Sequence, residues 1–488
     1  MPEPLRIKRL NFWASVFIIL AVTSCQRSFI EITPVDRVAK DAFFKTTNDL
    51  ALATNGVYAA QRSIYTTSDG YGMCHFVLSE CRTDNALQDP TDQAERWATS
   101  RFDETVGNIP LLSVWRDYYN TINLANMVID RGPNVTGGNQ DLIKRFMAEA
   151  KFIRACCYFV LAVYWGEVPL RINETADFTN AVKKRAPADD VYAQIIKDLT
   201  DAIAVLPSAY DNSTNNEKGR ATKWAATALL GKVYLQKGDK PKAASEFRAV
   251  IAAKLYSLLP RYADLWNAGN YNHSESIYEI SFGQANNTGN NFVGQFIPVN
   301  STSALGINVS GNSKPIRPTQ NLTQAYEEGD LRKAASVKTE ANGAPFIAKY
   351  IDYTATDALG GRNSWPVIRY ADVLLGLAEA LGETAEAYDC IKLVRERAGL
   401  APISAGTAGT FAEKLFKERR VEFAFEGQRW HDLLRLPKEQ TIAIINAEKP
   451  TDYPKDFRKI DAHHLLYPIP GQEIQPSGGA VTQNDGYR

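Results

Sequence analysis

Two helices joined by a tight turn are predicted between residues 220 and 254, and this pair limits the folds that the chain can adopt. The apolar side chains of the first helix recur at helical spacing: Ala225, Leu229, Leu230, Val233 and Tyr234. Gly238 and Asp239 then supply the turn. Pro241 stands at the start of the second helix, where a missing N–H does no harm. The segment is therefore typical of a helical hairpin.

This hairpin carries much of the tetratricopeptide pattern. The matching positions are Leu230, Gly231, Tyr234, Ala243 and Phe247. Small residues in such a pattern let two helices approach each other, and the large ones fill the gap between them. Thr227 stands where the pattern has Trp, so the match is incomplete. The pattern predicts a scaffold built from helical pairs.

Weaker helical patterns recur along the chain, at 111–130, 139–165, 188–206, 369–381, 384–397 and 411–425. Between them, residues 62–110 and 255–365 are rich in Asn, Gly, Ser, Thr and aromatic residues, and loops of that length usually carry function. The predicted fold class is mainly α, with tetratricopeptide-like helical repeats and long loop insertions. Residues 467–470 are expected to form an extended strap over the helices, because proline cannot continue a helix.

The first 24 residues are expected to be a lipoprotein signal peptide. Arg6, Lys8 and Arg9 give a positive start, and the apolar stretch 12–22 is too short to span a bilayer. Small residues then precede Cys25, whose thiol would carry the lipid as the first residue of the mature protein. The alternative is an ordinary signal peptide followed by a chance cysteine. One lipid on a folded body anchors a protein to a membrane without spanning it.

Charge and cysteine content exclude several classes of protein. Lys+Arg and Asp+Glu both number 55, so no strong field favours a nucleic-acid partner. The cysteines after Cys25 are odd in number and widely spaced, which is not typical of a disulfide scaffold. Cys74 and Cys81 could pair if the loop between them folds back. No pair has zinc-ligand spacing and there are five His, so neither a metal nor another cofactor is expected.

Five sequence blocks together resemble the SusD/RagB family of outer-membrane nutrient-binding lipoproteins. The blocks, in the family's order, are Cys25 with 29–34, then 148–170, 369–400, 418–435 and 466–487. They include Trp165-Gly166-Glu167-Val168-Pro169 and Glu426-Gly427-Gln428-Arg429-Trp430. The resemblance spans nearly the whole chain and divides it into an N-terminal helical-repeat region, 25–275, and a C-terminal region with binding loops and closing helices, 276–488. One departure is that 26–28 reads Gln-Arg-Ser, where surface-exported lipoproteins often have an acidic run.

The resemblance implies that the protein binds a nutrient, a glycan or oligosaccharide above all, at the surface of the outer membrane. It also implies delivery of that ligand to a SusC-like TonB-dependent transporter. Aromatic rings beside amide side chains suit a sugar, because rings stack on its C–H faces and amides bind its hydroxyls. Peptide capture is the alternative on the same scaffold. A glycosidase and a structural repeat adaptor are the alternatives from other classes.

A pair of carboxylates raises the question of catalysis. Glu422 and Glu426 are four apart on a predicted helix and share one face, and glycoside hydrolysis uses two carboxylates. Four arginines crowd the same segment: Arg419, Arg420, Arg429 and Arg435. Pairing with arginine would keep both acids ionised, which suits a structural network and not a general acid. No catalytic residue, and no enzymatic activity, is therefore expected.

The ligand-binding residues are expected in the two long loops, where rings lie beside hydrogen-bonding side chains. The first loop offers Arg82, Asp84, Asn85 and Trp97. The second offers Trp266, Asn267, Tyr271, Asn290, Asn291 and Phe292. Trp115 and Trp165 are set aside because they lie within helical patterns. The alternative for every chosen aromatic residue is core packing, since large rings are usually mostly buried.

Overall fold

The computed structural model describes most of the chain: residues 43–66, 73–90, 93–175, 182–210, 217–283, 288–298, 316–340, 343–448 and 457–487. The expected signal peptide, Cys25 and block 29–34 lie outside these residues, so the lipid anchor stays a prediction. No helix in the described ranges is long and apolar enough to cross a membrane.

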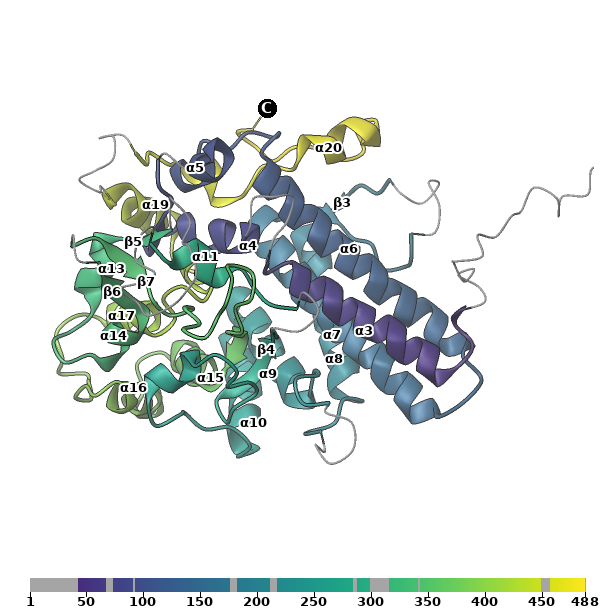
Figure 1. Ribbon diagram of the computed structural model, residues 1–488, viewed down its shortest axis with the longest axis horizontal. Helices are drawn as coiled ribbons and strands as arrows, with labels where there is room; N and C mark the ends of the chain where they lie inside the picture. Colours follow the sequence, from purple (N-terminus) through teal and green to yellow (C-terminus); the bar gives the residue numbers. More distant parts are fainter. Residues whose placement is uncertain are drawn as a thin grey trace, which may run out of the picture.

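Helices dominate the molecule and pack mainly as neighbours along the chain, which confirms the predicted mainly α fold. The long helices are α3 (Thr47–Ser63), α6 (Ile109–Arg131), α7 (Gln140–Trp165), α8 (Ala188–Ile203), α9 (Lys223–Gln236), α10 (Lys240–Ala252), α15 (Tyr370–Leu381), α16 (Ala385–Arg397) and α17 (Phe411–Glu422). Figure 1 shows α3, α6, α7 and α8 side by side in one half of the molecule. All the predicted helices are present, with ends shifted by a few residues at most.

Polar caps explain why many of these helices begin where they do. Asn108 and Asn139 accept backbone N–H bonds at the starts of α6 and α7. Asp239 does the same for α10, and Thr410 forms a capping box with Glu413 at the start of α17. Each cap satisfies N–H groups that have no partner within the helix, so local sequence sets these boundaries.

The predicted hairpin is formed by α9 and α10, and Phe247 joins it to α15. The ring is 1% exposed. A Cβ atom added to Gly231 on α9 would lie 2.7 Å from the ring, and one added to Gly376 on α15 would lie 2.8 Å from it. Glycine at both positions therefore lets three helices close around one aromatic side chain, as the tetratricopeptide pattern predicts for two of them.

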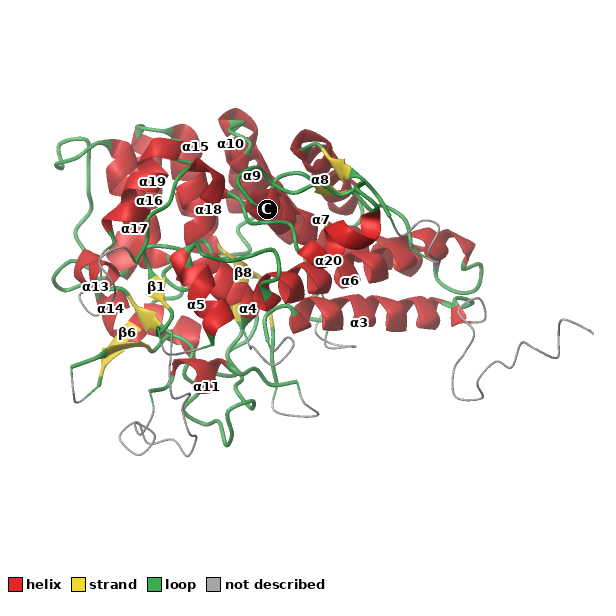
Figure 2. Ribbon diagram, turned by 90° about the horizontal axis from the view of Figure 1, so that it is seen from above, coloured by secondary structure: helices red, strands yellow, loops and turns green. Residues whose placement is uncertain are grey.

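The two long loops contain more regular structure than their composition predicts. The first holds α4 (Cys74–Phe76), η2 (Val77–Cys81), β1 (Ala86–Leu87) and α5 (Ala94–Arg101). The second holds η5 (Tyr262–Trp266), β4 (Ser276–Ile280), α11 (Phe292–Phe296), β5 (Arg317–Pro318), α13 (Gln320–Ala325), α14 (Leu331–Ser336), β6 (Val337–Thr339), β7 (Pro345–Ile347) and β8 (Trp365–Arg369). Figure 2 shows connecting segments gathered on the side of α11, away from α10 and α15. Trp97 lies on helix α5, which corrects its placement in an irregular loop.

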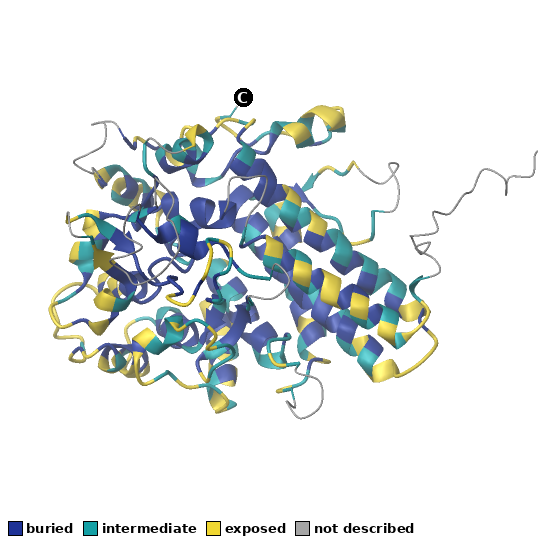
Figure 3. Ribbon diagram, in the orientation of Figure 1, coloured by how far each residue is buried: buried dark blue, intermediate teal, exposed yellow. Residues whose placement is uncertain are grey.

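The described strands pair only in twos, and every pair is antiparallel. β4 pairs with β8, β6 with β7, β1 with β5, and β2 (Val168–Pro169) with β3 (Arg185–Ala186). The β4–β8 pair begins and ends a long excursion of the chain, because 84 residues separate their facing ends, Ile280 and Trp365. A large apolar core underlies both halves, and a second, small cluster contains Val293 and Phe346. Figure 3 shows the buried faces turned inward. The predicted division near residue 275 stays a prediction.

The C-terminal segment crosses the helices as an extended strap, as predicted. The backbone N–H of Tyr467 donates to the carbonyl of Tyr164 at 2.8 Å, and Trp165 Nε1 donates to the carbonyl of Pro468 at 3.0 Å. Asn484 Nδ2 donates to the carbonyl of Trp165 at 3.0 Å. The remaining short helices of this half are α18 (Arg429–Leu434), α19 (Lys438–Ala447), η6 (Ala462–Leu465) and α20 (Gly471–Ile474). Cys74 and Cys81 are buried thiols on one helical segment and form no disulfide with each other.

Replacing Phe247 by Ala should lower the stability of the protein by about 3–5 kcal/mol, because the cavity would lie between three helices that cannot all collapse into it. The measurement is urea unfolding followed by circular dichroism. Ser245→Ala, at an exposed position on the same helix, is the matched control and should change stability little. Equal stability of the two variants would show that Phe247 does not join the helices.

Candidate ligand-binding site

Arg82 lies in the core of the described structure and not on a binding surface. Its side chain is 0% exposed and pairs with Glu104. The guanidinium carbon lies 3.8 Å from the centre of the Tyr467 ring and 4.4 Å from that of Phe102. A second nitrogen donates to the carbonyl of His464. The polar groups of Arg82 therefore hold the strap in place and offer no face to a ligand in this conformation.

Asp84 and Asn85 are also buried, and each binds arginines from the far end of the chain. Arg429 binds the Asp84 carboxylate with two nitrogens, at 2.7 and 2.8 Å. Burial would raise the pKa of Asp84, but the positive charges of Arg420 and Arg429 outweigh it and hold the pKa well below its usual range. Asn85 Oδ1 accepts from Arg420 Nε at 3.0 Å. These contacts join the first loop to α17 and α18.

Asn290 and Phe292 lie inside the second loop. Asn290 Nδ2 donates to the carbonyl of Asn363 at 2.7 Å, and its Oδ1 accepts the N–H of Phe292. The Phe292 ring is 0% exposed and packs against Tyr350 and Trp365. Of the ten residues chosen from composition, the six that are buried are Arg82, Asp84, Asn85, Asn290, Asn291 and Phe292. For five of these six residues, all except Asn291, the contacts described above explain the buried position as packing within the protein.

Four chosen residues keep accessible surface: Trp97, Trp266, Asn267 and Tyr271. Trp97 stacks one face on Phe457, with ring centres 5.2 Å apart and planes inclined by 24°. Trp97 belongs to α5, which reaches the second loop through a 3.0 Å hydrogen bond from Arg96 to Gln295 on α11. The other three lie together on the turn 266–271, which follows η5.

Trp266 is partly exposed, and its ring is held by contacts with neighbouring side chains. The Lys349 ammonium lies 4.2 Å from the ring centre, and Tyr350 meets the ring edge-on with centres 5.5 Å apart. Asn363 Nδ2 donates to the Trp266 carbonyl at 2.8 Å. These contacts fix the orientation of the ring, which suits a platform for a flat ligand face.

The turn 266–271 lies against Arg362, a residue that composition did not single out. The guanidinium approaches Gly269, and it also binds Asp352 Oδ2 through Nε at 3.3 Å. Tyr271 donates its hydroxyl to the carbonyl of Phe282, and burial raises the pKa of that hydroxyl. We call Trp266, Asn267, Tyr271 and Arg362 the loop surface. The sequence feature that could have pointed to Arg362 is its position in the glycine-rich run 360–363 of the second long loop.

Two clefts among the described residues lie elsewhere. One of about 390 Å³ is lined by the turn between α9 and α10 together with α17 and α18. Another of about 360 Å³ lies between residues 208–210, 218–222 and 272–278. Neither contains a residue chosen from the sequence.

The paired carboxylates Glu422 and Glu426 are buried in an ion network. Arg369 Nη1 binds Glu422 at 2.6 Å, Arg369 Nε binds Glu426 at 2.7 Å, and Lys349 binds Glu426 at 2.9 Å. Burial would raise the pKa of Glu422, but Arg397 and Arg369 hold it well below its usual range. This confirms the predicted pairing with basic residues, and the low pKa leaves Glu422 without a proton to donate.

The predicted partners of these two acids are wrong, because the nearby arginines pair elsewhere. Arg419 binds Asp432 and Asp372, and Arg435 binds Glu379. Arg420 and Arg429 bind Asp84, as described above. The basic residues that do neutralise the two acids come from distant segments: Arg332, Arg369, Arg397 and Lys349. Proximity along the helix did not decide the pairing, because these side chains point to different neighbours.

Comparison with known proteins agrees with this architecture over both halves. A sequence model described as the SusD family matches residues 261–487. A second, described as starch-binding associating with outer membrane, matches residues 43–235. SusD-like protein P2 of Formosa agariphila is 28% identical, with 96% of this chain and 99% of that protein covered. A SusD-like protein of Bacteroides ovatus is 27% identical over 87% and 82% of the two chains.

Solved structures give the same result. A laminarin binding SusD-like protein is 29% identical, with a TM-score of 0.78 over 91% of this chain and all of that chain. Surface glycan-binding protein A from Bacteroides fluxus is 25% identical, with a TM-score of 0.79 over the same shares. Fold and sequence thus define a mainly α protein whose tetratricopeptide-like helical pairs carry long loops. The chain belongs to the SusD/RagB family.

One buried acid makes the stability of the protein depend on pH. Glu80 on η2 is 0% exposed and accepts the N–H of Gly427 at 2.6 Å. Burial raises the pKa of Glu80 from 4.5 to about 8. Between these two values the folded protein keeps a proton that the unfolded chain releases, so the contribution of Glu80 to stability falls as pH rises through this window.

Glu80→Gln should remove this dependence, because an amide stays neutral at every pH in the window. Only the native protein loses stability through Glu80 as pH rises. The difference between the melting temperature of the variant and that of the native protein should therefore increase from pH 5 to pH 8. Differential scanning calorimetry at several pH values measures it. Glu439→Gln, at an exposed position, is the control and should follow the native curve. Parallel curves for native protein and Glu80→Gln would contradict the assignment.

Proposed function

We propose that the protein captures an oligosaccharide on the loop surface and is a binding protein without catalytic activity. The observation that carries the proposal is the fixed, partly exposed Trp266 ring beside Asn267 and Arg362, in a chain of the SusD/RagB family. A pyranose has C–H faces that stack on an indole and hydroxyls that bind amide and guanidinium groups. The loop surface supplies both kinds of contact at one place.

Relatives support a glycan as the class of ligand. The laminarin binding SusD-like protein and surface glycan-binding protein A are both named for carbohydrate ligands and share the fold over nine-tenths of this chain. The absence of catalysis is supported by the burial of Glu422 and Glu426, which leaves neither carboxylate open to a sugar in this conformation. Peptide capture is the alternative, and a ligand panel separates the two.

The proposed location is the outer membrane, with the folded body at the cell surface and held by a lipid on Cys25. The positive N-terminus, the short apolar stretch and the cysteine after small residues support the anchor. The description of the matching N-terminal family supports the membrane. Capture alone does not move a ligand across a membrane, so we propose a SusC-like TonB-dependent transporter as the partner.

Trp266→Ala and Asn267→Ala should each weaken binding of an oligosaccharide. Loss of a stacking platform costs about 1–3 kcal/mol by analogy with base–aromatic stacking, which corresponds to about five- to a hundredfold in Kd for Trp266→Ala. Asn267 is exposed, so its variant should keep the native melting temperature. Isothermal titration calorimetry against a panel of glycans, including laminari-oligosaccharides, and of peptides gives the affinities.

Trp224→Ala is the matched control, because this Trp is also partly exposed but lies on repeat helix α9. It should leave the affinity unchanged. Trp97→Ala tests the other platform chosen from the sequence. Native affinity in both loop-surface variants would place the ligand elsewhere, and binding of peptides without any glycan would favour the alternative function.

Gentle detergent extraction followed by affinity purification should recover a membrane protein of roughly twice the mass of this chain. That size is an expectation taken from the family, since a lid over a transporter barrel needs a large interface. Cys25→Ala is the control: it should appear in the soluble fraction or remain an unprocessed precursor. Recovery of the native protein alone, under conditions that preserve other membrane complexes, would contradict the partnership.

A further inference from the structure

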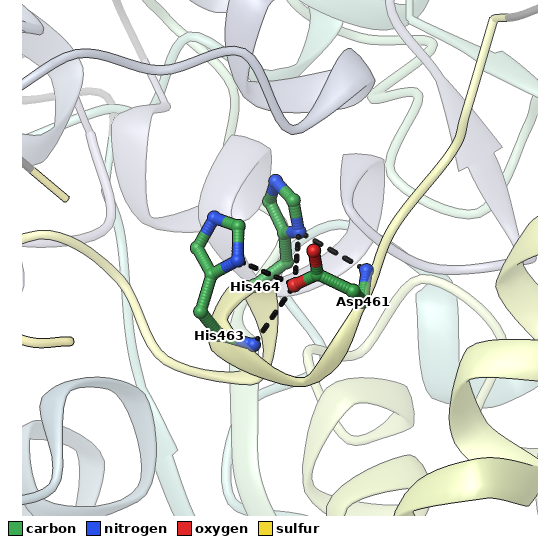
Figure 4. A group of neighbouring side chains, drawn as sticks. All are labelled: Asp461, His463 and His464. Carbon is green, nitrogen blue, oxygen red and sulfur yellow. Dashed lines mark hydrogen bonds and ion pairs between the residues drawn. The ribbon is translucent and has the colours of Figure 1, made fainter. Parts of the chain in front are cut away.

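A cluster of three possible metal ligands lies on the turn 461–464, far from the loop surface in sequence. Asp461, His463 and His464 each offer one ligand atom, and these atoms all lie within 4.8 Å of one another. Figure 4 shows both imidazoles turned toward the Asp461 carboxylate. Nδ1 of His464 is 3.2 Å from Asp461 Oδ1, and Nδ1 of His463 is closer still.

The backbone explains why spacing rules for zinc motifs miss this cluster. Residues 462–465 form the 3₁₀ helix η6, and Asp461 is its N-cap. Positions i and i+3 are eclipsed in a 3₁₀ helix, which places Asp461 beside His464. His463 then joins them from the first turn. The cluster is local, but it depends on a helix type that the sequence alone does not specify.

The hydrogen bonds of the cluster indicate which tautomer of His464 is present. The N–H of Asp461 donates to His464 Nδ1 at 3.2 Å, so this nitrogen carries a lone pair and not a proton, and a metal ion bound at Nδ1 would replace that hydrogen bond. The Asp461 oxygen that lies 3.2 Å away carries negative charge.

The donor set and its spacing suit an ion of the zinc class. Two imidazole nitrogens and one carboxylate oxygen bind zinc at about 2.0–2.2 Å, which puts neighbouring ligand atoms of a tetrahedron roughly 3.4 Å apart. The 3.2 Å separation between His464 and Asp461 is close to this value. Calcium and magnesium prefer oxygen ligands, so two imidazoles disfavour them. Solvent can reach the site, since the Asp461 side chain is 69% exposed.

The surrounding residues hold the two imidazoles in place. The carbonyl of His464 accepts from the buried Arg82, and the Tyr487 ring meets His463 edge-on with centres 5.1 Å apart. A Cβ atom on Gly486 would lie 2.4 Å from His463, so glycine is needed for the C-terminal segment to cover that ring. Ligands with such support bind metal more tightly than freely rotating side chains.

We propose that Asp461, His463 and His464 bind one divalent transition ion, zinc above all, with the remaining coordination positions open to water or to a fourth ligand. The ion lies between His463 Nδ1 and the Asp461 carboxylate, and the imidazole proton of His463 is then carried on Nε2. It fastens the turn 461–464, which carries the start of the strap and is held through Arg82 to the core. This site is independent of the proposed glycan binding.

The test uses the untagged mature protein, stripped with a chelator and titrated with ZnCl₂ by calorimetry. One zinc ion per chain should bind, and zinc should raise the melting temperature. Adding the chelator again should reverse this rise. Cobalt(II) should give the visible absorption bands of a site with nitrogen and oxygen ligands. Asp461→Asn, His463→Ala and His464→Ala should each weaken zinc binding at least about tenfold.

Asp485→Asn and His273→Ala are matched controls that change the same residue types outside the cluster, and both should bind zinc like the native protein. Melting in the absence of metal checks that each variant is folded; for any variant that is not, His463→Gln provides the less disruptive change. The proposal is overturned if the native protein binds no zinc, or if folded cluster variants bind it as tightly as the controls do.

Discussion

The buried guanidinium of Arg369 joins both ends of the long segment 276–368 to helix α17 and the residues just after it. Arg369 ends β8, and it binds Glu275, which directly precedes β4, at 2.8 Å. The same guanidinium binds Glu422 on α17 and Glu426 just after it. All four side chains are out of water, so each charge depends on its partners, and removal of one would leave the others buried and uncompensated. Ion pairs therefore fix both ends of the segment 276–368 to the helical scaffold.

A second set of buried polar side chains joins the first long loop to distant parts of the chain. Asp84 reaches Arg429, Arg82 reaches the strap, and Glu80 reaches Gly427, each across more than 300 residues of chain. In these contacts, the polar side chains of the loop are buried and bind other parts of the protein instead of solvent. In the proposed ligand surface, Asn363 binds the carbonyl of Trp266 and Asp352 accepts the N–H of Arg362. Rigid support for a partly exposed ring lowers the entropy lost on binding.

Helix boundaries were predictable from sequence because their causes are local. Apolar spacing, Asn108 and Asn139 as caps, and the Gly238–Asp239 turn act within a few residues of one another. The strap at Tyr467–Pro470 was predictable for the same reason. The site was predicted less well: Trp266, Asn267 and Tyr271 remain accessible, whereas Arg82, Asp84 and Phe292 are buried. The reason is that a sugar-binding loop and a loop buried in a polar core have similar amino-acid compositions.

The sequence by itself determined the helical scaffold, its hairpins and the family, since these depend on spacing within short segments and on blocks that keep their order. Only the tertiary structure decided which charged and aromatic side chains face solvent. Asp84 could be recognised as structural only once Arg429 stood beside it, and Glu422 found Arg369 and Arg397 in place of the arginines on its own helix. The physical reason is that burial and pairing are properties of neighbours in space, and for these residues the neighbours lie from tens to hundreds of positions away.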